Sequence, residues 1–239
     1  MTQLSFSDVE FDAKRKQTRR DKFLAEMDTV VPWARLSALI EPVYPKGKGG
    51  RPSYALETML RIHFMQQWFS LSDPAMEEAL YDMQSMRQFA SLSLTRGGIP
   101  DETTILNFRH LLEEHKLASR FLEEINAMLA ERGLLLKQGT IIDATFIEAP
   151  TLTKNASDKR DPEMHQVKKG NNWHFGMKAH IGTDAESGLV HSVETTPANE
   201  HDITQAHKLV HGEEEAVFGD AGYTGVEKRE DTKHIKATW

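Results

Sequence analysis

The spacing of hydrophobic positions divides the chain into two unlike halves. From about Arg19 to Gly133 these residues recur three or four positions apart, which predicts amphipathic helices, as in Leu56, Met59, Leu60 and Phe64. Beyond Gly133 the pattern changes to alternation and to runs of β-branched residues, which predicts strands. We therefore expect an α/β protein in which a helical region, residues 1–133, precedes a sheet domain, residues 139–239.

Turn and capping residues separate the helices of the first region. Asp73 is expected to cap a helix with its body at 75–90, and Asp101 begins another after the break at 97–100. The last helix is predicted from about Leu117 to Arg132. Short helices joined by tight turns are typical of helix-turn-helix DNA-binding units, although any small helical bundle gives the same pattern.

The second region is predicted to have the order β-β-β-α-β. The strands are expected at 139–147, 173–183, 189–195 and 215–219, and the helix at 199–211. Residues 150–172 are expected to form a basic loop, which contains Lys154, Lys159, Arg160, Lys168 and Lys169.

Composition restricts the chemistry that the chain can perform. The 239 residues include no cysteine, which excludes disulfides, thiolate metal sites and cysteine nucleophiles. No apolar run is long enough to span a membrane and no signal peptide is recognisable, so we expect a soluble, cytoplasmic protein without a membrane partner.

The charge distribution leaves the question of a nucleic-acid partner open. The net charge of −7 counts against such a partner. Basic residues nevertheless cluster near the start of the chain, at Lys14, Arg15, Lys16, Arg19, Arg20 and Lys22. A run of this kind is usually a solvated face, but it also suits an arm that contacts DNA phosphates.

Two aspartates are the leading candidates for chemistry. Asp143 stands inside an apolar strand that its neighbours Ile141, Ile142, Phe146 and Ile147 predict to be buried, where a charge is costly unless it is paired or binds a metal. The alternative is a solvent-facing position on an edge strand. Asp220 follows a short apolar strand directly and precedes a turn of small residues; the alternative is a turn or helix-capping aspartate. If the first and fourth predicted strands are neighbours, both carboxylates converge, and Mg²⁺ or Mn²⁺ would relieve their repulsion.

Four ordered blocks of sequence carry a resemblance to a known family. They are Asp143-Ala144-Thr145-Phe146-Ile147-Glu148-Ala149-Pro150, Trp173-His174-Phe175-Gly176-Met177-Lys178-Ala179-His180, Asn199-Glu200-His201-Asp202 and Asp220-Ala221-Gly222-Tyr223. In this order they resemble bacterial insertion-sequence transposases of the group typified by insertion sequence five. The helical region is similar to that group's amino-terminal region, so the resemblance covers nearly the whole chain.

The resemblance implies a fold, a reaction and a metal site. It implies a ribonuclease H-like catalytic domain with an Asp-Asp-Glu triad that holds two Mg²⁺ or Mn²⁺ ions, in which Asp143 and Asp220 match the two aspartates. The expected glutamate lies well over fifty residues beyond the second aspartate, and only 19 residues follow Asp220 here. We therefore expect an incomplete catalytic domain, a C-terminally truncated transposase, that is inactive alone.

The same resemblance suggests DNA contacts and partners. Five residues are candidates for contacting a DNA end: Lys168, Lys169, Trp173, His174 and Lys178. The cationic side chains would bind phosphates, and the indole of Trp173 would stack on a base. The alternative is that the basic residues belong to a solvated loop and that Trp173 is a core residue. His180 and Glu148 are expected, at most, to contact the metal ligands and not to bind the metal themselves. The expected partners are terminal inverted repeats and target DNA, bound by a homo-oligomer.

Two other functions remain as alternatives to an active transposase. The chain could bind DNA ends without catalysis and inhibit a full-length transposase. His201-Asp202 also resembles the metal pair of His-Asp phosphohydrolases, although helix capping by Glu200 or Asp202 is the simpler interpretation.

Overall fold

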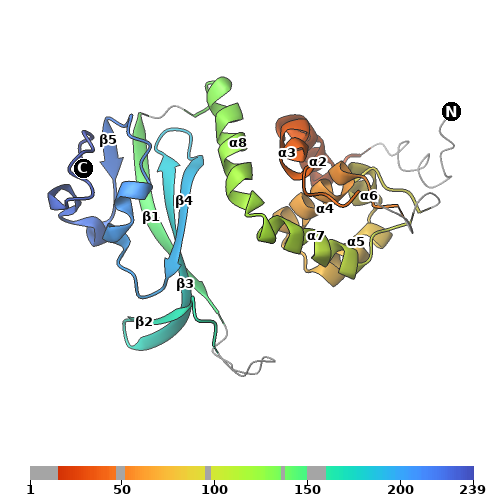
Figure 1. Ribbon diagram of the computed structural model, residues 1–239. Helices are drawn as coiled ribbons and strands as arrows, with labels where there is room; N and C mark the ends of the chain where they lie inside the picture. Colours follow the sequence, from red (N-terminus) through yellow and green to blue (C-terminus); the bar gives the residue numbers. More distant parts are fainter. Residues whose placement is uncertain (1–15, 47–51, 95–97, 136–137, 150–159) are drawn as a thin grey trace. The chain divides into compact units, whose positions relative to one another are not determined.

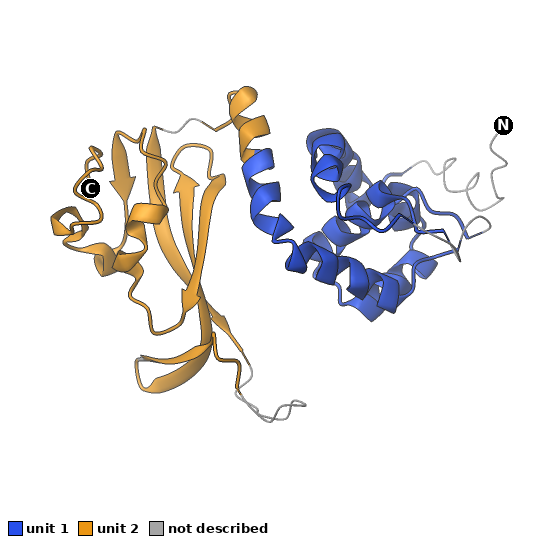
Figure 2. Ribbon diagram, viewed as in Figure 1, with its two compact units in different colours: residues 1–125 blue, residues 126–239 orange. Residues whose placement is uncertain are grey.

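The computed structural model describes residues 16–46, 52–94, 98–135, 138–149 and 160–239. The chain forms two compact units, residues 1–125 and 126–239, coloured separately in Figure 2. The division falls inside the last helix of the helical region. No helix among the described residues is long and apolar enough to cross a membrane.

Helices build the described part of the first unit (Figure 1). Their bounds are α2 (Arg19–Val30), α3 (Trp33–Ile40), α4 (Leu56–Phe69), α5 (Asp73–Asp82), α6 (Gln84–Phe89), α7 (Glu102–Glu114) and α8 (Leu117–Glu131), the last of which continues into the second unit. A single apolar cluster, which includes Leu36, Leu60 and Met76, forms the core of this unit, and these three side chains are fully buried.

The predicted helix at 75–90 is wrong in two details. Ser72, not Asp73, is its cap, because the Ser72 hydroxyl accepts from the Ala75 amide at 3.4 Å. Asp73 instead binds the Arg109 guanidinium through both carboxylate oxygens, at 3.1 and 2.9 Å. The extended backbone of Met83 divides the segment into α5 and α6.

The second unit is built on a five-stranded sheet. Its strands are β1 (Gly139–Glu148), β2 (His165–Lys169), β3 (Asn172–Asp184), β4 (Val190–Pro197) and β5 (Ala216–Phe218). β3 pairs antiparallel with β1, β2 and β4, and β5 pairs parallel with β1. The first and the last predicted strand, β1 and β5, are neighbours, which is the condition set for Asp143 and Asp220 to converge. β2 and the adjoining ends of β1 and β3 extend as a narrow arm, visible in Figure 1.

Two segments of this unit differ from the sequence prediction. β2 lies inside the expected basic loop, because its polar sequence His-Gln-Val-Lys-Lys gives no apolar alternation. The expected helix at 199–211 is replaced by two single-turn 3₁₀ helices, η1 (Asp202–Thr204) and η2 (Ala206–Lys208). Lys154 and Lys159 of the expected loop lie outside the described residues.

The two faces of the sheet have different surroundings. On one face, Ile142 and Val217 pack with Ala206, Leu209 and Tyr223 in an apolar cluster. Gly182 belongs to this face, and a Cβ atom there would lie 2.1 Å from the Leu209 carbonyl oxygen. The opposite face exposes large apolar side chains over 40% or more of their surface, namely Ile141, Val193 and Phe218. We call these the covered face and the open face.

Candidate functional site

Asp143 lies on β1 with its side chain exposed, and Asp220 follows the end of the neighbouring strand β5. Ile141 of β1 is the register partner of Phe218 of β5, and both are exposed. Asp143 lies two residues beyond the first, and Asp220 two residues beyond the second. Because side chains alternate along a strand, continuing this register past the end of β5 at Phe218 would direct both carboxylates to the same side of the sheet.

Each carboxylate is held by one oxygen and open at the other. Asp143 Oδ1 accepts from the Ala144 amide at 2.8 Å. Asp220 Oδ1 accepts from the Gly222 amide, also at 2.8 Å, and so caps the 3₁₀ helix η3 (Ala221–Tyr223). Within the described residues neither Oδ2 atom has a hydrogen bond. The amides orient the side chains and leave one oxygen of each free to bind a ligand.

Tyr223 is a buried phenol whose surroundings disfavour its ionised form. Burial, followed by the charges of Asp202, Asp143 and Asp220, raises the pKa of Tyr223 above its ordinary value. The phenol therefore keeps its proton at neutral pH.

The carboxylate oxygens of Asp143 and Asp220 are the type of donor atom that binds a hard divalent cation. Carboxylate oxygens are the ligands that Mg²⁺ and Mn²⁺ prefer, and Mg²⁺ is commonly held by one or two carboxylates with waters completing the shell. No group of three or more His, Cys, Asp or Glu side chains that could hold a metal occurs in the described part of the chain. Asp143 and Asp220 are thus two carboxylates whose free oxygens could serve as metal ligands.

The expectation that Asp143 is buried in its strand is wrong. Its side chain is exposed, and so are Ile141 and Ile147, whereas Ile142 is buried. The apolar run suggested burial on both sides, but the described residues cover only one face of the sheet. The solvent-facing alternative is the observed one, although β1 lies between β3 and β5 and not at an edge.

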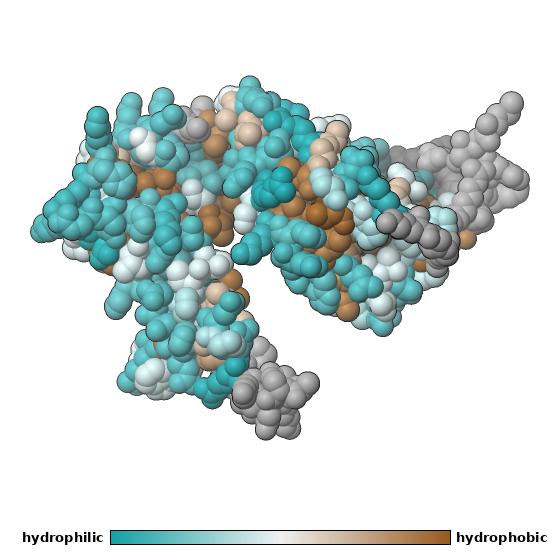
Figure 3. All heavy atoms as spheres, in the orientation of Figure 1, coloured by the Kyte–Doolittle hydropathy of each residue, from teal (hydrophilic) through white to brown (hydrophobic). Residues whose placement is uncertain are grey.

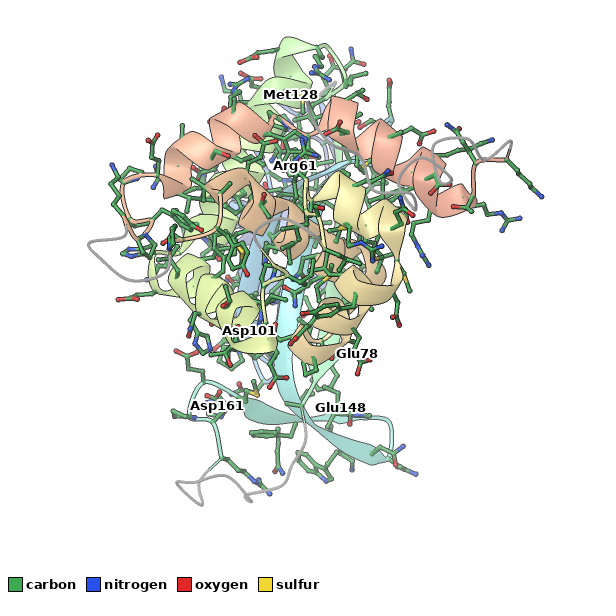
Figure 4. The ribbon with its side chains drawn as sticks, turned by 90° about the vertical axis from the view of Figure 1, so that its right-hand side faces the viewer. Arg61, Glu78, Asp101, Met128, Glu148 and Asp161 are labelled. Carbon is green, nitrogen blue, oxygen red and sulfur yellow. The ribbon has the colours of Figure 1, made fainter. Side chains whose placement is uncertain are left out.

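The arm separates the residues expected to contact DNA. Trp173 and Lys168 are register partners on β3 and β2, so they point to the same side, and the indole is 65% exposed. His174 points to the other side, where its ring packs against Phe146 and its Nδ1 lies 3.3 Å from Glu148. Figure 4 labels Glu148 at this end of the molecule. The side chain of Lys169 lies outside the described residues.

Lys178 lies away from the arm, in a polar network of the covered face. Its ammonium donates to the Glu200 carbonyl at 2.7 Å and to Asp202 Oδ1 at 2.8 Å. His180, fully buried, interacts with the Thr196 hydroxyl at 2.8 Å through Nε2. Burial lowers the pKa of His180, so the imidazole is neutral at pH 7. Asp202 does not cap η1, contrary to the simpler interpretation of the sequence.

The basic cluster of the helical unit is partly exposed. Lys16, Arg19 and Lys22 are exposed, whereas Arg20 packs on the Phe69 ring and donates to the Met83 sulfur. Lys14 and Arg15 lie outside the described residues. Figure 3 shows mainly hydrophilic residues on the visible surface of both units.

One pair of helices has the connection of a helix-turn-helix unit. Only Ser70 to Ser72 separate α4 from α5, and Ser70 adopts the left-handed conformation. However, α5 exposes Glu78, labelled in Figure 4, and Asp82. Carboxylates on a groove-facing helix repel DNA phosphates, so α5 is poorly suited to enter a groove. DNA docking by this unit remains a prediction.

Sequence reasoning missed three features around the candidate site. Tyr223, which ends the segment that begins with Asp220, is buried, and its sequence position alone indicates no role. The Lys178–Asp202 pair joins two other blocks and is visible only once the strand and η1 are folded. Glu214, with a fully buried side chain, accepts from the His211 and Gly212 amides at 2.6 and 2.7 Å. Only the recurrence of charged residues within apolar segments signals such positions in the sequence.

Comparison with known proteins adds two matches, one in each unit. Residues 11–111 match the family described as Transposase domain (DUF772), and residues 135–238 match the family described as Transposase DDE domain. No solved structure matches the chain. The second match contains both Asp143 and Asp220, and DDE transposases depend on divalent metal ions. Together the two matches support an insertion-sequence DDE transposase.

Proposed function

We propose that the chain acts at the ends of an insertion sequence of the group typified by insertion sequence five. The reaction is metal-dependent cleavage of a phosphodiester bond and transfer of the strand to target DNA. Asp143 and Asp220 are the first two of three catalytic carboxylates, in a ribonuclease H-like domain. The partners are terminal inverted repeats and target DNA, bound by a homo-oligomer.

One observation supports this proposal: Asp143 lies on β1 and Asp220 follows the neighbouring strand β5, and each carboxylate has one oxygen without a hydrogen bond among the described residues. Their Oδ1 atoms are held by backbone amides, which fixes the carboxylate planes before any ligand binds. A preorganised pair of this kind loses less conformational entropy on binding a cation. When bound, divalent ions would activate a water or a 3′-hydroxyl and stabilise the leaving oxygen of the phosphodiester.

The arm contains the residues that we propose to contact the DNA end. Trp173 offers an exposed ring on which an unpaired base can stack, and Lys168 lies directly across the strand pair to contact a phosphate. Lys178 has a different role, because its ammonium already binds Asp202 and the Glu200 carbonyl. We propose that it shapes the covered face and does not contact DNA directly.

The third carboxylate determines whether the 239-residue polypeptide cleaves DNA. The acids that follow Asp220, which are Glu227, Glu230 and Asp231, make contacts away from the pair; Asp231, for example, binds Arg229 through both oxygens at 3.0 Å. With two ligands the nucleophile is poorly fixed, and a displacement of about 1 Å can cost roughly a hundredfold in rate. We therefore propose that this polypeptide, tested alone, binds DNA ends without nicking them.

A nicking assay tests this absence of activity. Transposon-end duplex is incubated with the polypeptide and Mg²⁺ or Mn²⁺, and Asp143→Ala protein serves as the control. We expect no nicking above the control. Robust nicking that disappears in Asp143→Ala would overturn the proposed inactivity and support a complete site.

A binding assay tests the alternative role as an end-binding inhibitor. We expect the wild-type protein to prefer terminal inverted repeats over random duplex in a gel shift. Trp173→Ala should weaken binding of an end with unpaired bases by about fivefold or more, since one stacked base contributes roughly 1–3 kcal/mol. Tyr81→Ala, which removes an exposed aromatic ring from the helical unit, is the matched control. Equal binding of both duplexes would exclude end recognition by this chain.

A further inference from the structure

The helical unit contains a small cavity with aromatic walls. Its volume is about 270 Å³, and its lining includes Tyr44, Tyr54, Phe108, Pro45 and Pro52. The Tyr44 and Phe108 rings meet edge to face, with their centroids 6.2 Å apart. Ligand cavities in proteins commonly have volumes of about 300–1,000 Å³. A volume just below this range suits a single planar ring system better than a helix or an extended peptide.

Two hydrogen bonds hold the walls of this cavity together in the absence of a ligand. The Tyr44 hydroxyl donates to the Tyr54 carbonyl at 2.8 Å, and the Ser53 hydroxyl donates to the Pro45 carbonyl at 3.1 Å. Phe108 is only 6% exposed and belongs to the apolar core of the unit, which fixes its ring. A preformed cavity of this kind loses less conformational entropy when it binds a ligand.

Two polar side chains of α7 line the same cavity. Thr104 and Asn107 are three residues apart and therefore lie on one face of the helix. Neither side chain has a hydrogen bond within the part of the chain that the structure describes. The Asn107 carboxamide offers a donor and an acceptor side by side, and the edge of a nucleobase presents complementary groups at the same spacing.

The cavity is uncharged, and a cation lies beside it. No lining residue that the structure describes carries a charge. Lys46 directly follows Pro45 of the wall, and its side chain is exposed. A nucleobase is neutral and planar, whereas the phosphate attached to its sugar is an anion. The base therefore matches the cavity, and the phosphate matches the ammonium next to it.

We propose that this cavity binds one unpaired nucleobase of a DNA strand, which stacks on the aromatic walls and forms hydrogen bonds with Thr104 and Asn107. Lys46 contacts the adjoining phosphate. The inference rests on the proposed function, because it takes DNA as the partner. The base must be unpaired, since removing a paired base from the duplex stack costs free energy. The cavity is a second site for a base, in addition to Trp173 of the arm.

Photo-crosslinking with a single-stranded oligonucleotide that carries one iodouracil base tests this inference. The halogenated base forms crosslinks mainly with aromatic side chains against which it lies. The 239-residue chain and its Trp173→Ala variant are compared, because Trp173 is the other ring proposed to stack on a base. Mass spectrometry should identify a crosslinked peptide that contains Tyr44, Tyr54 or Phe108 in both proteins.

The positions of the crosslinks separate failure of the inference from failure of the proposed function. Crosslinks at Trp173 alone, or at other residues outside the cavity, would overturn the base site and leave DNA as the partner. If the strand binds neither protein, DNA itself is wrong as the partner, and the proposed function fails together with the inference.

Substitutions on α7 test the hydrogen bonds, with binding measured by fluorescence anisotropy in the Trp173→Ala background. Asn107→Leu and Thr104→Val should each weaken binding of the single strand by about fivefold, which is the loss of one neutral hydrogen bond. Thr103→Val is the matched control, because Thr103 is exposed on the same helix and is absent from the lining of the cavity. It should bind as its parent does.

An abasic strand distinguishes contact with a base from contact with the backbone. It retains the phosphates but has no ring to enter the cavity, so Asn107→Leu and its parent should bind it equally. If Asn107→Leu weakens binding of the abasic strand as much as that of the complete strand, or if Thr103→Val has the same effect as Thr104→Val, the proposal is overturned.

Discussion

The two faces of the sheet in the second unit differ in role: one contributes mainly to stability, and the other exposes the residues proposed to bind ligands. The covered face contains tightly packed apolar side chains and buried polar groups, most with partners, such as Glu214 with two backbone amides. The open face has apolar side chains in solvent and two aspartates with free oxygens. Substitutions on the covered face should therefore affect folding, and substitutions on the open face should affect ligand binding.

Gly182→Ala should have the largest effect on folding. The new Cβ would lie 2.1 Å from the Leu209 carbonyl oxygen, so one backbone segment must move. We expect a loss of about 3 kcal/mol or more in the free energy of unfolding of the second unit. Hydrogen exchange of peptides from β3 and β4 measures it.

Gly139→Ala is the control for this substitution, because its nearest atom is the Ala185 Cβ at 3.2 Å, a contact that a small shift relieves. If peptides from β3 and β4 had equal protection from hydrogen exchange in the Gly182→Ala and Gly139→Ala proteins, this result would contradict the close packing of Leu209 on the sheet.

Two consecutive residues of β5 offer the sharpest comparison of the faces. Val217 is 3% exposed on the covered face, and Phe218 is 55% exposed on the open face. Val217→Ala should cost about 2 kcal/mol, because it removes two buried carbon groups. Phe218→Ala should cost under about 0.5 kcal/mol, although it removes more atoms. Urea unfolding measures both, and a larger cost at Phe218 would mean that the open face is covered in solution.

Glu214→Gln should have a smaller effect that depends on pH. Burial alone would raise the pKa of Glu214, but hydrogen bonds from the His211 and Gly212 amides and the nearby His211 ring outweigh it and lower the pKa. A carboxyl whose pKa is lowered on folding stabilises the protein above its unfolded pKa, near 4.3, and this contribution is lost as the pH falls through the folded value.

We expect Glu214→Gln to cost about 1.5 kcal/mol at pH 7, since a charged acceptor is replaced by a neutral one. The cost should narrow below about pH 4, where the wild-type carboxyl begins to protonate. Denaturant unfolding at pH 7 and at pH 3.5 measures the difference. A cost that is independent of pH would mean that Glu214 is not ionised in the folded protein.

The sequence predicted the strands better than their surroundings. Runs of β-branched residues locate β1 and β5, and the turn at 184–188 locates the hairpin of β3 and β4. β2 was missed because its residues are polar. The segment at 199–211 has helical spacing, yet only two single turns form there. Local pattern does not report that the Leu209 carbonyl must lie against Gly182, a constraint set by residues far apart in sequence.

For the candidate site, the sequence indicated the residues but not their environment. The sequence indicates Asp143 and Asp220 as candidates, and the strand that contains Asp143 is the neighbour of the strand that leads to Asp220. Burial of Asp143 was predicted from apolar neighbours, which cannot reveal that one face of the sheet is open. Lys178 was expected to contact DNA, yet Asp202, 24 residues away in sequence, binds its ammonium. Such pairings depend on tertiary structure and have no local signal.

Anomalous diffraction from crystals grown with Mn²⁺ tests the central claim most directly. We predict a manganese peak on the open face within about 2.0–2.2 Å of an oxygen of both Asp143 and Asp220. The same peak should be absent from Asp143→Asn crystals. A wild-type crystal in which manganese binds elsewhere, or binds only one of the two aspartates, would contradict the shared site.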